Sequence, residues 1–262
     1  MKLLPPNLTS YDLLKSAALL LMFVDHIGYF FYPDEIWLRV AGRLCVPIWC
    51  FLIGYANSRD LGPMLWGGMI VVAVGKSIAG FPFFPLNILA LFIFARLILD
   101  GLMPGILVRP QIFWAASILM FLLAIPSYAL FEYGTEGLLL VMFGYLMRHQ
   151  AGARGCQRNL PESFMAFALA VFVLLETALF GFSQGQTAVL AAGGLAVMGC
   201  LYFFRPREFI NFHNIISLPL KFMGRHTLEL YVAHILLFSA AGVWLYPERF
   251  RFLSWNWIGI QP

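Results

Sequence analysis

The chain has 262 residues, of which 61% are hydrophobic and only 11% are charged. Soluble domains are roughly 45–50% apolar and 25% charged, so this composition excludes an ordinary soluble protein. The net charge of +4 comes from basic residues in short loops, which does not indicate nucleic-acid binding. The four cysteines show no C-x-x-C spacing and therefore predict neither a structural zinc site nor a disulfide framework.

Apolar stretches recur along the whole chain, each near the roughly 20 residues that a spanning helix needs. Turn residues and charge clusters divide them into about nine predicted transmembrane helices. These are residues 13–32, 36–56, 63–80, 84–100, 111–131, 135–148, 163–181, 186–204 and 226–246. The sequence thus predicts an all-α polytopic membrane protein with one integral-membrane domain over residues 1–262. Residues 135–148 are short for a span, and residues 214–224 are open to an interfacial or a re-entrant placement.

The basic residues of the loops predict the orientation in the membrane, because cytoplasmic loops carry an excess of Lys and Arg. With the N-terminus inside, the cytoplasmic segments contain Lys2, Lys15, Arg59, Arg109, Arg148, Arg154, Arg158, Arg205, Arg207, Lys221 and Arg225. The opposite loops, residues 80–85, 132–136 and 181–186, contain no Lys or Arg. We therefore expect a cytoplasmic N-terminus and a C-terminus outside.

Charged residues inside a bilayer are costly, so each one is a candidate site residue. In the first span, "DLLKSAALLLMFVDHIGYFF", Lys15 and His26 lie three helical turns apart on one face, about 16 Å along the axis. This stripe predicts a cation at the cytoplasmic mouth of a tunnel and an imidazole deeper in the membrane. Adjacent residues do not face each other on a helix, so Asp25 is expected to meet another helix, with Arg43 as the first choice. The alternatives are a Lys15 that only snorkels and a His26 that only bonds between helices.

The other spans contribute further polar residues. Arg43 follows Gly42 and precedes Pro47, a combination that permits a loosened backbone if neighbouring groups satisfy it. Asn87 and Arg96 in the fourth span point to opposite faces, and Lys76 and Glu176 have no assigned role. In the last span, "MGRHTLELYVAHILLF", no two histidines have the i, i+3 or i, i+4 spacing of a metal site, so we expect no metal.

Four segments together resemble one family. "DLLKSAALLLMFVDHIGYFF", "LRVAGRLCVPIWCFLIGYANSR", "AGFPFFPLNILALF" and "ELYVAHILLF" occur in the order typical of the TraX family, membrane proteins associated with N-terminal acetylation of conjugative pilin. Two motifs also resemble those of the wider integral-membrane acyltransferase superfamily. One is a basic residue separated by ten residues from a histidine, here Lys15 and His26, and the other is the Y-x-x-H motif of Tyr231 and His234 in the last span.

The resemblance implies acetyl-CoA as the donor, bound from the cytoplasm, and an amine or hydroxyl outside the bacterial inner membrane as the acceptor. The leading acceptor is the N-terminus of a pilin, followed by a surface glycan. Expected catalytic residues are His26 as general base, with Asp25, Arg43 and His234. Expected acyl-CoA-binding residues are Lys15, Asn87, Arg96 and Arg225, and Asn87 is also a candidate oxyanion donor beside Arg43.

Two other classes of protein fit the same polar residues. A small proton- or solute-coupled transporter would use intramembrane Asp, His and Arg, although the sequence has no visible internal repeat. A structural subunit of a secretion or conjugation machine would use them as interhelical contacts.

Overall fold

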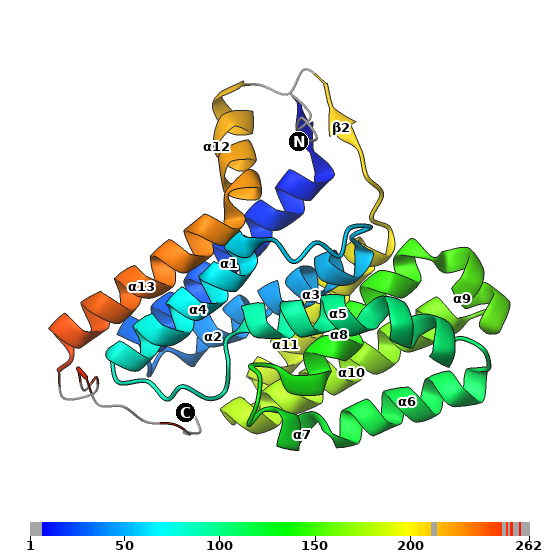
Figure 1. Ribbon diagram of the computed structural model, residues 1–262, viewed down its shortest axis with the longest axis horizontal. Helices are drawn as coiled ribbons and strands as arrows, with labels where there is room; N and C mark the ends of the chain where they lie inside the picture. The colour runs from blue at the N-terminus through cyan, green and yellow to red at the C-terminus, as the bar shows by residue number, and fades with distance from the viewer. Residues whose placement is uncertain (1–6, 211–213, 248–249, 251, 254–256, 258–262) are drawn as a thin grey trace.

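The computed structural model describes residues 7–210 and 214–247, together with residues 250, 252, 253 and 257 (Figure 1). Its helices are α1 Ser10–Phe31, α2 Ile36–Arg43, α3 Cys45–Tyr55, α4 Pro63–Ile78, α5 Ile88–Ile106, α6 Pro110–Leu122, α7 Ala124–Ser127, α8 Gly134–Arg148, α9 Gln150–Cys156, α10 Leu160–Phe180, α11 Gln184–Tyr202, α12 Asn214–Arg225 and α13 Thr227–Leu245. Two strands, β1 Leu8–Thr9 and β2 Glu208–Phe209, pair antiparallel. The all-α polytopic class is confirmed.

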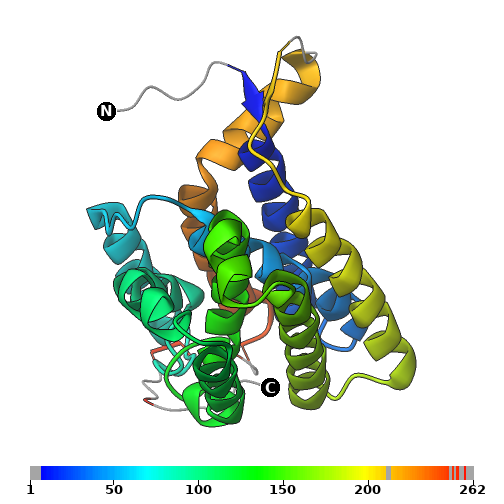
Figure 2. The same cartoon turned by 90° about the vertical axis from the view of Figure 1, so that its right-hand side faces the viewer.

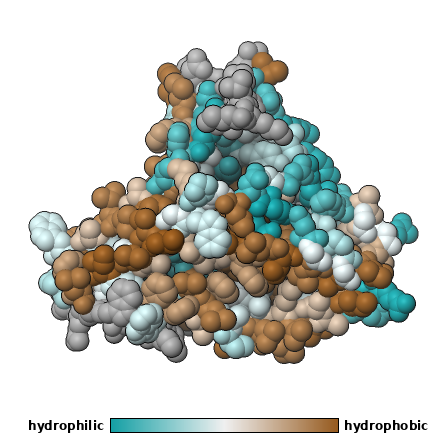
Figure 3. Space-filling model, in the orientation of Figure 1, coloured by the Kyte–Doolittle hydropathy of each residue, from teal (hydrophilic) through white to brown (hydrophobic). Residues whose placement is uncertain are grey.

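Within the described residues, six helical segments are long and apolar enough to cross a membrane: α1, the segment Ile36–Tyr55 that contains α2 and α3, α5, α10, α11 and α13. The helices α4 and α6 are apolar but shorter. Apolar side chains cover much of the bundle surface, while hydrophilic ones gather below the projecting end that contains α12 and β2 (Figure 3). The chain is therefore an integral membrane protein, whereas the count of nine spans stays a prediction.

The second predicted span is interrupted at Leu44, between α2 and α3. Pro47 has no N–H, so the α-helical bond to the carbonyl of Arg43 cannot form. The N–H of Leu44 bonds instead to the carbonyl of Ala41, three residues back, at 3.3 Å. The loosened backbone expected between Gly42 and Pro47 is thus present, and it ends α2 directly after Arg43.

The fourth predicted span, residues 84–100, is displaced along the chain in the structure. Its helix α5 begins at Ile88 because Asn87 caps it, with the Asn87 side chain accepting a bond from the N–H of Leu89 at 3.1 Å. The helix continues to Ile106, through Pro104. The charged and turn residues near position 100 predicted that the helix ends there. Asp100 instead lies exposed on the helix surface in an ion pair with Arg59, so it does not interrupt the helix.

The short helix α8 lies at the centre of the bundle, among α3, α5, α6 and α10 (Figure 1). Its backbone touches that of α3 at two glycines, since a Cβ on Gly54 would overlap the carbonyl of Val141 and a Cβ on Gly144 would overlap that of Phe51. Neighbouring helices cover α8 over most of its 15 residues, so it meets little of the bundle's surface. This burial explains why residues 135–148 looked too short for a lipid-facing span.

The helix α12 projects from the bundle beside β1 and β2, as Figure 2 shows. One face packs on α1, where the Ser16 hydroxyl donates to the carbonyl of Leu220 at 2.8 Å. The opposite face exposes Ile215, Leu218 and Phe222. Residues 214–224, left open by the sequence, thus form an amphipathic helix attached to the start of α1.

Candidate functional site

The site begins where α2 crosses α1 at a glycine. A Cβ on Gly42 would overlap the Cβ and Cα atoms of Asp25, so only glycine allows the two backbones to approach this closely. Arg39 and Arg43 are one helical turn apart on α2 and therefore share a face. The crossing places both guanidinium groups over the single carboxylate of Asp25.

Asp25 binds both arginines. Its Oδ2 lies 2.7 Å from Nη1 of Arg39, whose Nη1 also donates to the Asp25 carbonyl at 3.1 Å. Its Oδ1 lies 3.3 Å from Nε of Arg43. The expected pairing of Asp25 with Arg43 is confirmed, and Asp25 makes no bond to the adjacent His26. The sequence analysis did not select Arg39, because an arginine at the fourth residue of a span is usually interfacial. Its spacing of four residues from Arg43, which places both on one helix face, was the signal that could have identified it.

Arg43 is enclosed by further partners from other helices. Its Nη1 donates to the hydroxyl of Tyr133, its Nε lies 3.5 Å from Oε2 of Glu176, and its guanidinium lies 4.2 Å from the ring centroid of Phe180. Tyr133 has a left-handed backbone, with φ at 67°, at the start of α8. Such conformations are uncommon outside glycine and recur at functional sites.

His26 pairs with His234 from α13. Nε2 of His234 lies 2.9 Å from Nδ1 of His26, and Nδ1 of His234 lies 2.9 Å from the carbonyl oxygen of Leu230. A carbonyl only accepts, so Nδ1 of His234 must carry a hydrogen and its Nε2 must accept in the neutral ring. His26 therefore donates from Nδ1 and keeps a lone pair on Nε2. The two histidines selected from the sequence are brought together.

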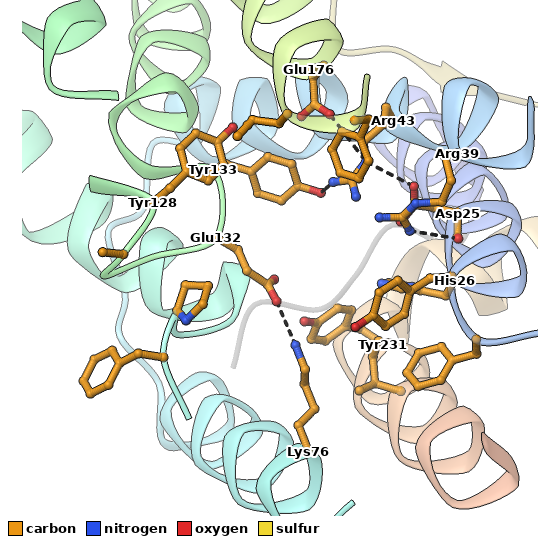
Figure 4. Close-up of a pocket in the computed structure, with 18 of the residues that line it drawn as sticks. Asp25, His26, Arg39, Arg43, Lys76, Tyr128, Glu132, Tyr133, Glu176 and Tyr231 are labelled. Atoms are coloured by element: carbon orange, nitrogen blue, oxygen red, sulfur yellow. Dashed lines mark hydrogen bonds and ion pairs between the residues drawn. The ribbon is translucent and has the colours of Figure 1, made fainter. Parts of the chain in front are cut away.

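These groups line a cavity of about 380 Å³ (Figure 4). Its lining residues are Asp25, His26, Tyr29, Phe30, Arg39, Arg43, Lys76, Phe84, Pro85, Ile125, Tyr128, Ala129, Glu132, Tyr133, Glu176, Leu179, Phe180, Tyr231 and Ile235. Several come from the loop residues 80–85 and 132–136 and from the end of α10, the side that the loop charges predict to be outside. His26 is five residues before the end of α1, about 8 Å from it, so the cavity lies toward this end of the bundle.

An ion pair crosses the cavity between α4 and the segment before α8. Nζ of Lys76 lies 2.9 Å from Oε1 of Glu132, while Oε2 of Glu132 accepts a bond from the N–H of Ile88 at 3.1 Å. Figure 4 shows this pair opposite Asp25 and Arg39, with the open space between. Lys76, which had no assigned role, and Glu132, which the sequence did not single out, thus belong to the site.

Two acidic residues close to this cavity are almost completely buried. Glu136 is 0% exposed and Glu176 is 1% exposed. The hydroxyl of Tyr128 donates to Oε2 of Glu136, whereas Oε1 of Glu136 and both oxygens of Glu176 make no hydrogen bond to a described residue. Glu176 was a candidate from its depth in the span, while Glu136 was missed because it lies near a predicted loop.

Asn87 is not brought to His26. Its side-chain oxygen caps α5, its Nδ2 donates to the carbonyl of Met69 at 2.9 Å, and it does not line the cavity. Both ends of the amide are therefore used in the structure of α4 and α5. The structure therefore does not place Asn87 in the cavity beside Arg43, where an oxyanion donor was expected, while its part in binding acyl-CoA stays a prediction.

The remaining candidates for acyl-CoA binding lie toward the start of α1. Lys15 lies in the second turn of α1, and Nη1 of Arg96 donates to the carbonyl of Asp60. Arg225 lies 3.7 Å from Asp12 and donates to the carbonyl of Asn7. None of these three basic residues lines the cavity.

The stripe between Lys15 and His26 is filled by packed side chains. Leu19 is 0% exposed and Met22 is 5% exposed, and neither lines the cavity. Among the described residues, no three His, Cys, Asp or Glu side chains are placed to hold a metal ion. The site is thus a cavity with one basic imidazole nitrogen and three cations, separated from Lys15 by packed apolar residues.

Comparison with known proteins identifies relatives of this chain. A family described as "TraX protein" matches residues 10–241. The chain is 23% identical over 258 residues to "Uncharacterized protein RP591" of Rickettsia prowazekii (strain Madrid E), a match that covers 95% of this chain and 98% of the relative. No solved structure matches the chain.

Two relatives carry the family's name. The chain is 32% identical over 142 residues to "Protein TraX" of Escherichia coli, covering 51% of this chain and 54% of the relative. It is 32% identical over 138 residues to "Protein TraX" of Escherichia coli (strain K12), covering 50% and 53%. These two matches span about half the length of each relative. Because the family match runs from the start of α1 into α13, the chain belongs to the TraX family.

Proposed function

We propose that this chain is an acetyltransferase of the bacterial inner membrane, which moves an acetyl group from cytoplasmic acetyl-CoA to an amine or hydroxyl outside. The observation that carries the proposal is the His26–His234 pair, whose bond to the Leu230 carbonyl leaves a lone pair on Nε2 of His26 beside the cavity. The family resemblance supports the N-terminus of a pilin as acceptor, with a surface glycan next.

In this mechanism His26 is the general base. The acceptor enters the cavity from the outer end of the bundle and gives its proton to Nε2 of His26, since the free lone pair of a neutral imidazole nitrogen can accept a proton. His26 keeps its Nδ1–H bond to Nε2 of His234 throughout, so the ring stays in one orientation. His234 is a positioning residue, and Asp25 acts through the two arginines that it binds.

The charges of the cavity support a binding mode in which the acetyl group of acetyl-CoA lies in the cavity and its phosphates lie elsewhere. Three acids, Asp25, Glu132 and Glu176, face three cations, Arg39, Arg43 and Lys76. A cavity with balanced charge does not suit the several phosphate charges of CoA. The phosphates would instead lie at the cytoplasmic end near Lys15, Arg96 and Arg225, about 16 Å along α1 from His26. Passage of the pantetheine then requires Leu19 and Met22 to move apart.

The proposal is tested by acetyl transfer in membranes that contain the chain. Radiolabelled acetyl-CoA is added with a membrane extract from the source cell, and wild type is compared with His26→Ala. Label on a macromolecule only with the intact histidine supports the proposal and identifies the acceptor. A His26→Ala protein with wild-type transfer would contradict it. Thermal unfolding with and without acetyl-CoA shows whether each protein binds the donor, because a ligand bound only by the folded state raises stability.

One observation favours a second candidate, a proton-coupled transporter. Glu136 and Glu176 are buried and have carboxylate oxygens without a hydrogen-bond partner among the described residues, an arrangement found in intramembrane proton carriers. Glu176→Gln distinguishes the two functions. Transport would stop when this carboxyl can no longer release a proton, whereas acetyl transfer would continue because the carboxyl does not touch the reacting atoms.

A further inference from the structure

We infer that Arg39, and not Arg43, is the catalytic residue that donates hydrogen bonds to the oxyanion formed during acetyl transfer. This inference rests on the proposed function and names a residue that neither the sequence motifs nor the family match singles out. It follows from the contacts of the two arginines that share Asp25.

Arg39 donates hydrogen bonds from only one of its three guanidinium nitrogens to the described residues. Its Nη1 binds both Oδ2 and the carbonyl oxygen of Asp25, at 2.7 and 3.1 Å. Within the described part of the chain, all of its hydrogen bonds come from this one nitrogen, which leaves the N–H groups of Nε and Nη2 without a partner. Figure 4 shows the guanidinium of Arg39 between Asp25 and the open cavity, above His26.

The position of Arg39 is fixed before any substrate binds. Its guanidinium lies 5.1 Å from the ring centroids of both Tyr29 and Phe180, and its side chain is 11% exposed. Asp25 precedes His26 on α1, so the same turn of helix holds the base and the anchor of Arg39. Donors that are fixed in a water-poor site stabilise developing negative charge without having to reorganise.

Arg43 is enclosed by partners from several elements. Its Nη1 donates to Tyr133, and its buried Nε, which makes no hydrogen bond to a described residue, forms ion pairs with Asp25 at 3.3 Å and Glu176 at 3.5 Å. Its face is covered by Phe180 at 4.2 Å. Three anionic or hydroxyl groups already surround it, so Arg43 holds α1, α2 and α10 together, while Arg39 faces the space where a substrate would lie.

The chemical step is balanced without another reactant. The acceptor nitrogen or oxygen attacks the thioester carbon, its proton passes to Nε2 of His26, and the carbonyl electrons move to the oxygen, which Nε and Nη2 of Arg39 bind. The C–S bond then breaks as the carbonyl re-forms, and the leaving thiolate takes the proton from His26. The products are the acetylated acceptor and CoA thiol, and His26 returns to its neutral state.

The experiment measures kcat and KM for both substrates in wild type, Arg39→Ala and Arg39→Lys, with and without added guanidinium. A lost oxyanion donor lowers kcat by roughly 10²–10³-fold. We expect this loss in both variants, with little change in KM, and partial recovery of kcat in Arg39→Ala when guanidinium fills the vacated space. The matched control is Arg154→Ala, because Arg154 lies on the surface in an ion pair with Glu162 and should leave kcat unchanged.

The outcomes separate this inference from the proposed function. Wild-type kcat in Arg39→Ala, or loss of kcat in folded Arg39→Ala that guanidinium does not restore, would overturn the role of Arg39 while leaving the acetyltransferase intact. If Arg39→Ala does not fold, Arg39→Lys keeps the charge beside Asp25 and decides the question by its kcat. Absence of transfer by wild type itself would instead remove the proposed function.

Discussion

Nε2 of His234 lies 2.9 Å from Nδ1 of His26, a contact that joins the last helix of the bundle to the first. The bond from His234 to the carbonyl of Leu230 sets the direction of this contact, so His26 donates and its other nitrogen remains basic. The two residues are 208 positions apart in the sequence. This pairing gives the histidine in the apolar helix α1 a defined partner and a defined tautomer.

His234→Leu is expected to lower kcat by about 10²-fold, the lower end of what general-base catalysis contributes. Without its acceptor, His26 can take the other tautomer and rotate away from the cavity. The measurement is the pH profile of kcat together with KM, since loss of orientation changes the profile and leaves the KM for acetyl-CoA unchanged. His226→Leu is the control, because His226 lies exposed directly before α13, two helical turns from His234. Identical profiles for wild type and His234→Leu would show that the pairing is only structural.

Asp25→Asn should destabilise the protein by about 3–5 kcal/mol, because it leaves two buried guanidinium groups without their shared counter-ion. The measurement is thermal or denaturant unfolding in detergent. Asp100→Asn is the matched control, since Asp100 is 60% exposed in its pair with Arg59, and such pairs contribute about 0–1 kcal/mol. Equal losses in the two variants would mean that the Asp25 pairs contribute no more than a surface ion pair.

Gly42→Ala should cost about 1–3 kcal/mol of stability and reduce acetyl transfer, because the added methyl group forces α2 away from Asp25. Gly101→Ala is the control: a Cβ there meets nothing within 4 Å, so stability should be unchanged or slightly higher. Unfolding free energies and transfer rates of both variants check the prediction. A stable, active Gly42→Ala protein would contradict the close crossing of α1 and α2.

Cysteine labelling tests the orientation that the loop charges predict. In a background without Cys156 and Cys200, Gln184→Cys should react with a membrane-impermeant maleimide in intact cells, and Asn57→Cys should react only after lysis. Both positions are exposed in the structure: Asn57 lies on the loop after α3, and Gln184 is the first residue of α11. The reverse pattern would place the cavity on the cytoplasmic side and require the acceptor to be cytoplasmic.

Much of the fold was predictable because hydropathy alone decides which segments become membrane helices. All nine predicted segments contain helix, and the failures were local. Leu44 interrupts the second segment through the missing N–H of Pro47, and α5 begins later than expected because Asn87 caps it. The burial of α8 was not predictable, since it depends on the backbone contacts of Gly54 and Gly144 with helices distant in sequence.

The site was predictable only in part. Asp25, His26, Arg43 and His234 stand out because charged or titratable residues deep in apolar spans are costly, and the structure gathers all four. Asn87 was misplaced because the same polarity serves to cap a helix. Arg39 and Glu132 were not selected because both lie close to predicted span ends, where a charged side chain can reach water and costs little free energy. Only the three-dimensional crossing of α1 and α2 and the approach of α4 to Glu132 bring them to the cavity.

The central claim is acetyl transfer across the membrane with His26 as base, and vesicles with the donor on one side test it most directly. Radiolabelled acetyl-CoA is sealed inside proteoliposomes with the chain in its predicted orientation, and the acceptor is supplied only outside. The account predicts label on the external acceptor with wild type and none with His26→Ala. Label that appears equally with both proteins, or that never leaves the lumen with wild type, would contradict it.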